Sequence, residues 1–245
     1  MIWQTRFGKC IYNADSGAQV WENLFFRWLK LGSNALQTVI NKSFPHKPVL
    51  HYVQLLIYAA RLLPGNCCLL GLGGAGAAHA LAEQDRESPI TAVELEQEVI
   101  DLAYRYFQLD KIANLSVIHQ DASDFIRQNQ SLFNHILVDL SNAHCYPPSC
   151  ATGDFFQHCY RSLTDQGILA VNVANVKEQK PILDLMRAQF GTAVLCMPVR
   201  DCANMIIMSS KNPNHKFLLN LFRGDKRVKK LFWEEYWGYV AHLKQ

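Results

Sequence analysis

Short apolar runs alternate with helix-favouring runs through the middle of this chain, and the alternation limits the folds that it can adopt. The apolar runs are expected to be strands, at residues 67–71, 90–94, 115–119, 135–139 and 168–173. The runs between them are expected to be helices, at residues 75–83, 97–107, 123–129 and 153–163. Short apolar strands separated by helices are typical of a parallel sheet with helices on both faces. The sequence therefore predicts a doubly wound α/β fold.

The sheet is expected to close with an antiparallel pair. A helix at about residues 178–189 leads to the runs "TAVLCMPV" and "CANMIIMSS", which are separated only by "RD". A parallel return needs about a dozen residues or more, so this link is too short for one. A Rossmann-like doubly wound sheet with an antiparallel terminal hairpin resembles the fold of adenosyl-methionine-dependent methyltransferases. The dinucleotide-binding sheet, by contrast, is all parallel.

The two ends of the chain differ from its middle. Between residues 7 and 41, β-favouring runs are punctuated by turn residues, which predicts a small N-terminal antiparallel β-domain. Pro45 and Pro48 then precede an apolar run at residues 49–63 that is expected to be a buried helix. These features divide the chain into a β-domain, a Rossmann-like domain and a C-terminal tail, at residues 1–48, 49–210 and 211–245.

Charge is unevenly distributed along the chain, whose formal net charge is +3. Eight of the 24 Lys and Arg, but only three of the 21 Asp and Glu, lie in the tail at residues 211–245. Aromatic residues such as Trp233 and Trp237 are interleaved with these charges. The tail is therefore expected to be a docked helix with a solvated basic face, and binding to nucleic acid is not expected.

Membrane insertion and secretion are not indicated by the sequence. No apolar run reaches the length of about 18 residues that a membrane helix needs, and the start "MIWQTRFGKC" lacks the pattern of a signal peptide. We therefore expect a cytoplasmic protein without membrane association. Most of its eight cysteines are expected to fill the core as small apolar residues.

The first predicted strand runs into "LLGLGGAG", in which Gly71, Gly73 and Gly76 form a G-x-G-x-x-G pattern. Glycine lets the backbone approach a ligand closely, and the helix that follows offers unpaired N–H groups. The pattern suits the pyrophosphate of a dinucleotide and also an adenosyl-sulfonium compound. The glycines alone leave both ligands open.

Acidic residues stand at the ends of the next three predicted strands, where a wound sheet binds its ligand. Glu94 can accept both hydroxyls of a ribose, and Asp121 with the N–H of Ala122 can bind an adenine ring. Asp139 follows a strongly apolar strand, where it can take a proton from an amine. The alternatives are an exposed strand-end residue for Glu94 and a charge at a helix N-terminus for Asp121.

Segments of the chain between Phe7 and Gly167 resemble, in order and spacing, the spermidine synthase family of polyamine aminopropyltransferases. They are "LGSNALQTVIN", "HYVQLLIYAA", "LLGLGGAG", "AVELEQEVIDLAYRYF", "QDASDFI", "ILVDLSNA" and "FFQHCYRSLTDQGILAVN". The resemblance implies a small β-domain ahead of an adenosyl-methionine-type fold. It also implies transfer of an aminopropyl group from decarboxylated adenosyl-methionine as co-substrate, with no tightly bound cofactor and no metal.

The resemblance also implies roles for individual residues on the donor. Glu94 would hold the ribose and Asp121 with Ala122 the adenine, while Gln37 and Tyr52 would line the sulfonium end. The residues expected to bind the donor are Gln37, Tyr52, Gly71, Gly73, Gly74, Glu94, Asp121 and Ala122.

On the acceptor side, the resemblance makes Asp139 the acid that deprotonates the amine. Tyr52, Ser141 and Asn142 would contact this small-molecule amine. The run "VDLSNA" is closer to the "D-L-T" of spermine synthases than to the "D-S-S-D-P" of spermidine synthases. The sequence is also compatible with a homodimer.

The sequence departs from the family pattern at several polar positions. Gly74 stands where the family has an aspartate that pairs with the amino end of the donor, Asn142 replaces the second acid of "D-S-S-D", and Gln54 replaces the acid of "Y-H-E". Burying a diammonium without nearby carboxylates is unfavourable. The departures weaken the expectation of putrescine as acceptor and leave intact adenosyl-methionine open as donor.

Other functions remain open at this point. A methyltransferase on the same fold, or a ligand-binding homologue without activity, would also suit the departures, whereas an NAD-dependent oxidoreductase is disfavoured because no Tyr-x-x-x-Lys pair is apparent. A zinc site is not expected either. His and Cys crowd residues 144–159, but no second ligand pair recurs at metal-site spacing.

Overall fold

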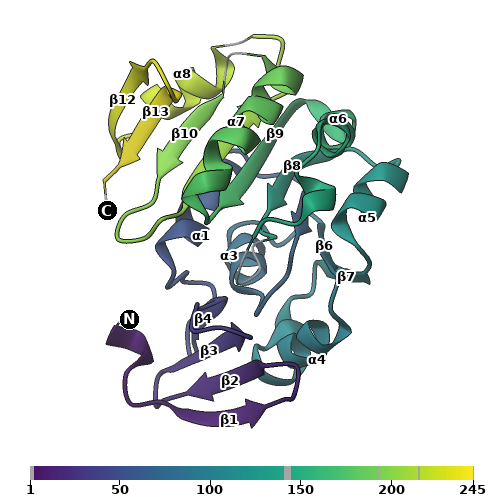
Figure 1. Ribbon diagram of the computed structural model, residues 1–245, viewed down its shortest axis with the longest axis vertical. Helices are drawn as coiled ribbons and strands as arrows, with labels where there is room; N and C mark the ends of the chain where they lie inside the picture. The colour runs from purple at the N-terminus through teal and green to yellow at the C-terminus, as the bar shows by residue number, and fades with distance from the viewer. Residues whose placement is uncertain (1–2, 141–144, 192–193, 215, 245) are drawn as a thin grey trace.

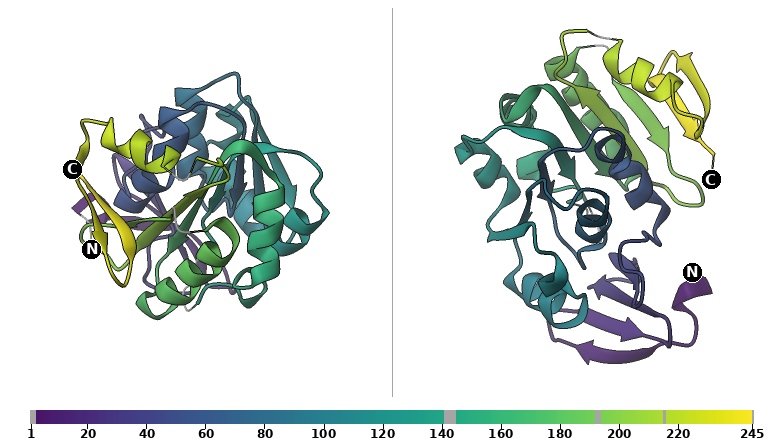
Figure 2. Two further views of the ribbon diagram at one scale, coloured as in Figure 1. Left: turned by 90° about the horizontal axis from the view of Figure 1, so that it is seen from above. Right: turned by 180° about the vertical axis from the view of Figure 1, so that it is seen from behind.

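Two β-sheets organise the chain, a four-stranded antiparallel sheet and a nine-stranded mixed sheet (Figure 1). The computed structural model describes residues 3–140, 145–191, 194–214 and 216–244. The small sheet lies at one end of the molecule, and helices cover both faces of the large sheet (Figure 2). This architecture confirms the predicted doubly wound α/β fold with an N-terminal antiparallel β-sheet.

The small sheet is a meander that follows a short 3-10 turn, η1 (Trp3–Thr5). Its strands, in both sequence and spatial order, are β1 (Lys9–Asn13), β2 (Ala18–Glu22), β3 (Phe26–Leu31) and β4 (Thr38–Asn41). Val20, Leu29 and Ile40 are buried in one cluster with Val99 and Phe107 from the main body of the molecule. This shared core packs the small sheet onto the main body of the molecule. Residues 37–38, at the start of β4, therefore lie beside the large sheet.

The strands of the large sheet lie in the order β12-β13-β10-β11-β9-β8-β5-β6-β7. Five of them are parallel: β5 (Cys67–Leu70), β6 (Ile90–Glu94), β7 (Leu115–His119), β8 (Phe133–Val138) and β9 (Leu163–Val173). The strands β10 (Leu195–Pro198) and β11 (Met205–Ser210) form the predicted antiparallel pair, and β11 is also antiparallel to β9.

Alternating residues of the central strands face two separate hydrophobic layers. Cys67 and Leu69 of β5 pack on one side, whereas Cys68 and Leu70 pack on the other. The first side is covered by α1 (His51–Leu56), α2 (Tyr58–Leu62), α3 (Gly76–Gln84), α4 (Gln97–Tyr106) and α8 (Phe217–Arg223). The second side is covered by α5 (Ala122–Gln128), α6 (Gly153–Arg161) and α7 (Val176–Phe190).

Short irregular segments connect these elements. The apolar run at 49–63 forms α1 and α2 rather than one helix, with Ile57 as the residue between them. Two further 3-10 turns are η2 (Leu109–Lys111) and η3 (Pro148–Cys150). Within the described ranges, no helix is both long and apolar enough to cross a membrane.

The C-terminal tail differs from the prediction of a docked helix at residues 211–245. Among the described residues of the tail, α8 is the one helix, and β12 (Val228–Glu234) and β13 (Gly238–Leu243) form an antiparallel hairpin. β13 pairs in parallel with β10 through Leu195 and Cys196. The aromatic residues lie in strands rather than on a helix face, because "VKKLFWE" and "GYVAHL" are rich in β-favouring residues. The hairpin also covers an edge of β10 that would otherwise expose unpaired backbone groups.

The sheet grows in opposite directions from the pair β5 and β8, so its ligand crevice is expected at their carboxyl ends. Gly71 follows β5 there, with a φ of +99°. The Gly71 N–H donates to Val93, and the Asp139 N–H donates to Leu70, each at 2.8 Å. A side chain on Gly71 would overlap the carbonyl group of Asp139.

Gly71→Ala is therefore expected to lower the free energy of unfolding by at least about 2 kcal/mol, because it adds steric overlap to an unfavourable φ. Chemical denaturation measures this change. Gly153→Ala is the matched control, since a Cβ there meets no atom within 4 Å, and it should change stability by less than about 0.5 kcal/mol. Equal effects of the two substitutions would contradict the close approach at Gly71.

Candidate active site

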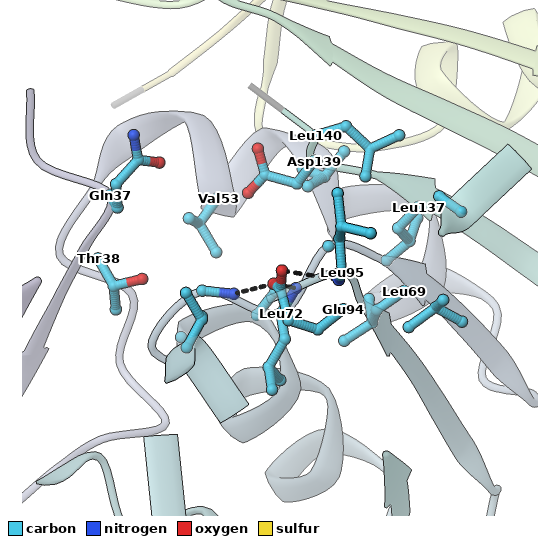
Figure 3. A pocket seen from close by; sticks show the side chains of 18 of the residues that line it. Gln37, Thr38, Val53, Leu69, Leu72, Glu94, Leu95, Leu137, Asp139 and Leu140 are labelled. Atoms are coloured by element: carbon cyan, nitrogen blue, oxygen red, sulfur yellow. Dashed lines mark hydrogen bonds between the residues drawn. The ribbon is translucent and has the colours of Figure 1, made fainter. Parts of the chain in front are cut away.

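A pocket lies over the carboxyl ends of β5, β6 and β8, with β4 and α1 forming its other wall (Figure 3). Figure 3 shows Asp139 and Glu94 facing this pocket, with Gln37 and Thr38 across from Leu137 and Leu140. The structure brings together eight of the residues predicted from the sequence: Gln37, Tyr52, Gly71, Gly73, Glu94, Asp121, Ala122 and Asp139. Two other predicted residues, Ser141 and Asn142, lie outside the described residues.

Glu94 ends β6 and is held by four backbone N–H groups. Its Oε2 accepts hydrogen bonds from Leu72 and Gly73, at 3.1 and 3.3 Å. Its Oε1 accepts hydrogen bonds from Leu95 and Glu96, at 2.9 and 3.1 Å. The glycine loop and the start of α4 thus fix the orientation of the carboxylate. A ribose that binds Glu94 would have to share or replace these donors.

Asp121 has the structural role that the sequence left as an alternative. It is the N-cap of α5, and its Oδ1 accepts hydrogen bonds from Ser123 and Asp124 at 2.8 and 3.0 Å. Oδ2 has no hydrogen bond to any described residue, and both Asp121 and Ala122 line the pocket. The cap therefore orients one oxygen of the carboxylate and leaves the other for a ligand.

Asp139 follows β8, and its carboxylate is held by two other elements. The Tyr52 hydroxyl of α1 donates to Oδ2 at 3.1 Å, and Nδ2 of Asn172 in β9 donates to Oδ1 at 2.8 Å. Asn172 is 1% exposed and is fixed in turn by Asn204, whose Nδ2 donates to Asn172 Oδ1 at 2.8 Å. These contacts give the carboxylate a single orientation beside the pocket.

The surroundings of Asp139 make it more basic than an ordinary carboxylate. Burial raises the pKa of Asp139, and the charge of Glu94 raises it further, while the hydrogen bonds from Asn172 and Tyr52 oppose the rise. Burial and the charge of Asp139 raise the pKa of Tyr52 well above its usual range. Tyr52 therefore keeps its proton and acts as a donor, and Asp139 is suited to accept a proton.

Gly74 is buried and does not line the pocket, although the sequence placed it on the donor. Its N–H donates to Oγ1 of Thr38 in β4 at 2.8 Å. A Cβ at Gly74 would lie 2.9 Å from Cβ and Cγ2 of Thr38 and from Cδ1 of Phe107. The space where the family aspartate would begin is thus filled by Thr38 and Phe107.

Sequence reasoning missed three polar residues of the site. Asn172 could have been found as an amide inside the otherwise apolar strand "ILAVNV". Thr38 stands beside the recognised Gln37 but has no pattern of its own. Asn204 stands in the run "CANMIIMSS" that is expected to be a strand, but β11 begins one residue later at Met205, and no local signal identifies the role of this amide.

The charge of the pocket is entirely negative within the described part of the chain. Four carboxylates line it, those of Glu94, Glu96, Asp121 and Asp139, and none of its described lining residues is Lys, Arg or His. Such a site favours a ligand that carries positive charge. No group of three or more His, Cys, Asp or Glu in the described ranges is placed to hold a metal ion.

Comparison with known proteins identifies the family. Residues 65–216 match the model of the spermine/spermidine synthase domain. A polyamine aminopropyltransferase of Chromobacterium violaceum is 25% identical over 228 residues, which are 89% of this chain and 86% of the relative. A polyamine aminopropyltransferase of Neisseria meningitidis serogroup A is 25% identical over 211 residues, 84% of this chain and 79% of the relative.

Solved structures share the fold. A probable spermidine synthase from Corynebacterium glutamicum superimposes with a TM-score of 0.73 at 17% identity, over 98% of this chain and 92% of that protein. Human methyltransferase-like protein 13 in complex with SAH gives a TM-score of 0.60 at 18% identity, over 76% of this chain and 96% of that protein. With the match of the family domain, these results show that the chain belongs to the spermine/spermidine synthase family and is a transferase.

Proposed function

We propose that this protein transfers an aminopropyl group from decarboxylated adenosyl-methionine to an amine. The observation that carries the proposal is the fixed carboxylate of Asp139, which faces a pocket shared with Glu94 and Asp121. In this proposal, Glu94 binds the ribose of the donor and Asp121 binds its adenine. Asp139 then lies at the end of the pocket where the sulfonium and the amine meet.

The negative pocket supports a decarboxylated donor. Decarboxylated adenosyl-methionine carries a sulfonium and an ammonium, whereas intact adenosyl-methionine adds a carboxylate. No Lys, Arg or His among the described lining residues is placed to pair with that carboxylate, and four acids would repel it. Decarboxylated adenosyl-methionine has the higher net positive charge of the two donors, so it suits this acidic lining better.

The proposed reaction is an in-line displacement at the carbon of the aminopropyl group that is bonded to sulfur. The amine nitrogen forms the new C–N bond as the C–S bond breaks, and the bonding electrons stay on sulfur, which leaves as neutral methylthioadenosine. The surplus proton of the amine passes to the carboxylate of Asp139. Since the sulfonium is already a good leaving group, the protein contributes mainly orientation and removal of the proton.

One observation favours methyl transfer as the second candidate. Thr38 and Phe107 fill the space at Gly74, so no carboxylate stands there to bind the amino end of a decarboxylated donor. Intact adenosyl-methionine is therefore not excluded by a charge at that position. The negative lining of the remaining pocket makes this candidate the weaker one.

Decarboxylated adenosyl-methionine is expected to bind at least about tenfold more tightly than adenosyl-methionine, a difference of about 1.4 kcal/mol. The reason is the mismatch between a ligand carboxylate and the acidic lining. Isothermal titration calorimetry with both compounds, methylthioadenosine and NAD measures the order of affinities. Tighter binding of adenosyl-methionine would favour methyl transfer, and binding of NAD alone would exclude both transfer reactions.

Asp139→Asn is expected to lower kcat by at least about 100-fold, because the amide cannot take the proton of the amine. The dissociation constant of the donor should change by less than about threefold, since Glu94 and Asp121 are retained. Steady-state assays of methylthioadenosine release and calorimetry provide the two measurements. Asp165→Asn removes a 96% exposed carboxylate outside the pocket and should leave both values unchanged. A fully active Asp139→Asn variant would exclude the role as base.

The acid limb of the pH–rate profile is expected to follow Asp139. Activity needs the ionised carboxylate, so kcat/KM should fall as the pH drops through the raised pKa of Asp139. Asn172→Ala and Tyr52→Phe each remove a hydrogen bond that lowers this pKa. Both variants should therefore lose activity at higher pH than the unchanged enzyme. An acid limb that stays in place in both variants would show that another group controls it.

A further inference from the structure

The carboxylates of the pocket are unequally available to an amine. Glu94 binds four backbone N–H groups, and one oxygen of Asp121 caps α5. Glu96 is an exposed residue at the N-terminus of α4. Among the lining acids, Asp139 is the one joined to Tyr52. One carboxylate is therefore positioned at the end of the pocket assigned to the acceptor.

Among the described residues that line this end of the pocket, no second carboxylate is placed beside Tyr52 and Asp139 for a remote ammonium group. Glu178 lies close enough to Tyr146 for both of its oxygens to accept the Tyr146 N–H at 3.1 Å, but Glu178 does not line the pocket. The residues outside the described ranges include no Asp or Glu side chain. Those positions, Ser141 and Asn142 included, therefore add no acidic side chain to the acceptor end.

The wall next to Tyr52 is apolar instead. We define the apolar wall as the apolar pocket residues of β4, the following link and α1: Val39, Pro45, Pro48, Val49, Leu50, Val53 and Leu56. Val49 and Leu50 are half-buried, so they keep apolar surface that a ligand can cover. Tyr52 stands between Leu50 and Val53 in the chain and reaches Asp139. Tyr52 thus links the apolar wall to the proton acceptor, since it precedes Val53 in α1 and its hydroxyl donates to Asp139.

We propose that the acceptor is a primary amine whose remaining part is apolar and uncharged, rather than a diamine or a longer polyamine. This inference rests on the aminopropyl transfer proposed above. The reacting amine lies beside Asp139, and its hydrocarbon part covers the apolar wall. A second ammonium there would lose water without gaining a carboxylate, which is unfavourable, whereas a methyl group at the same place gains from burial.

Matched pairs of acceptors test this inference directly. The full chain is assayed with decarboxylated adenosyl-methionine and either n-butylamine or putrescine, then with n-pentylamine or cadaverine. Members of each pair differ by a terminal amino group. The monoamine is expected to give at least about tenfold higher kcat/KM for methylthioadenosine release, because it avoids the unpaired charge. A higher value for the diamine would overturn the proposed acceptor while leaving aminopropyl transfer in place.

A binding measurement separates failure of this inference from failure of the proposed function. The same amines are titrated into the protein saturated with methylthioadenosine. The monoamine should bind at least about tenfold more tightly, whether or not turnover is seen. Equal or tighter binding of the diamine would overturn the inference. Monoamine binding without methylthioadenosine release from any amine would reject aminopropyl transfer instead.

A charge added to the apolar wall provides the complementary test. Val49→Asp should shift the ratio of kcat/KM toward putrescine by at least about tenfold, because it supplies the missing partner for the second ammonium. Val49→Asn has nearly the same shape without the charge and should leave the ratio unchanged. Leu50→Asp and Leu50→Asn repeat the comparison if a Val49 variant fails to fold. An equal shift with Asp and Asn would contradict the proposal.

Discussion

The pairing of β5 with β8 is the constraint on which the site depends. The sheet extends in opposite directions from this pair, so the chain segments after both strands emerge at the same crevice. Gly71 lets the two segments approach, since a Cβ there would overlap the Asp139 carbonyl group, and its N–H donates to Val93, the residue before Glu94. The proximity of these two acids contributes to the raised pKa of Asp139. The pairing of β5 with β8 therefore determines both the backbone conformation at Gly71 and part of the rise in the pKa of Asp139.

Much of the fold could be predicted because its signals are local. The strands β5, β6 and β8 are largely buried apolar runs. Glu94 ends β6, and Asp121 and Asp139 follow the strands to which the sequence assigned them. The C-terminal tail could not be predicted in the same way. Its aromatic and basic residues fit an amphipathic helix as well as a hairpin, and the choice depends on the open edge of β10.

The parts of the site that escaped prediction depend on contacts between distant segments. Asn172 and Asn204 are 32 residues apart, and their hydrogen bond needs β9 and β11 to be paired. Thr38 reaches Gly74 across 36 residues because the small sheet packs on the main body. Neither contact joins residues at a spacing from which it could be predicted. Residues at strand ends can be predicted from topology, whereas their supporting partners need the packed structure.

The contact between Thr38 and Gly74 also limits how this protein can change over evolutionary time. An aspartate at position 74 would collide with Thr38 and Phe107, which already occupy its first side-chain position. A change of Gly74 to aspartate therefore requires Thr38 to become smaller or to move first, and the opposite order passes through a destabilised intermediate. The residue at position 74 is thus constrained by a neighbour from another sheet, so whether this chain can gain an acid there depends on the order of the mutations.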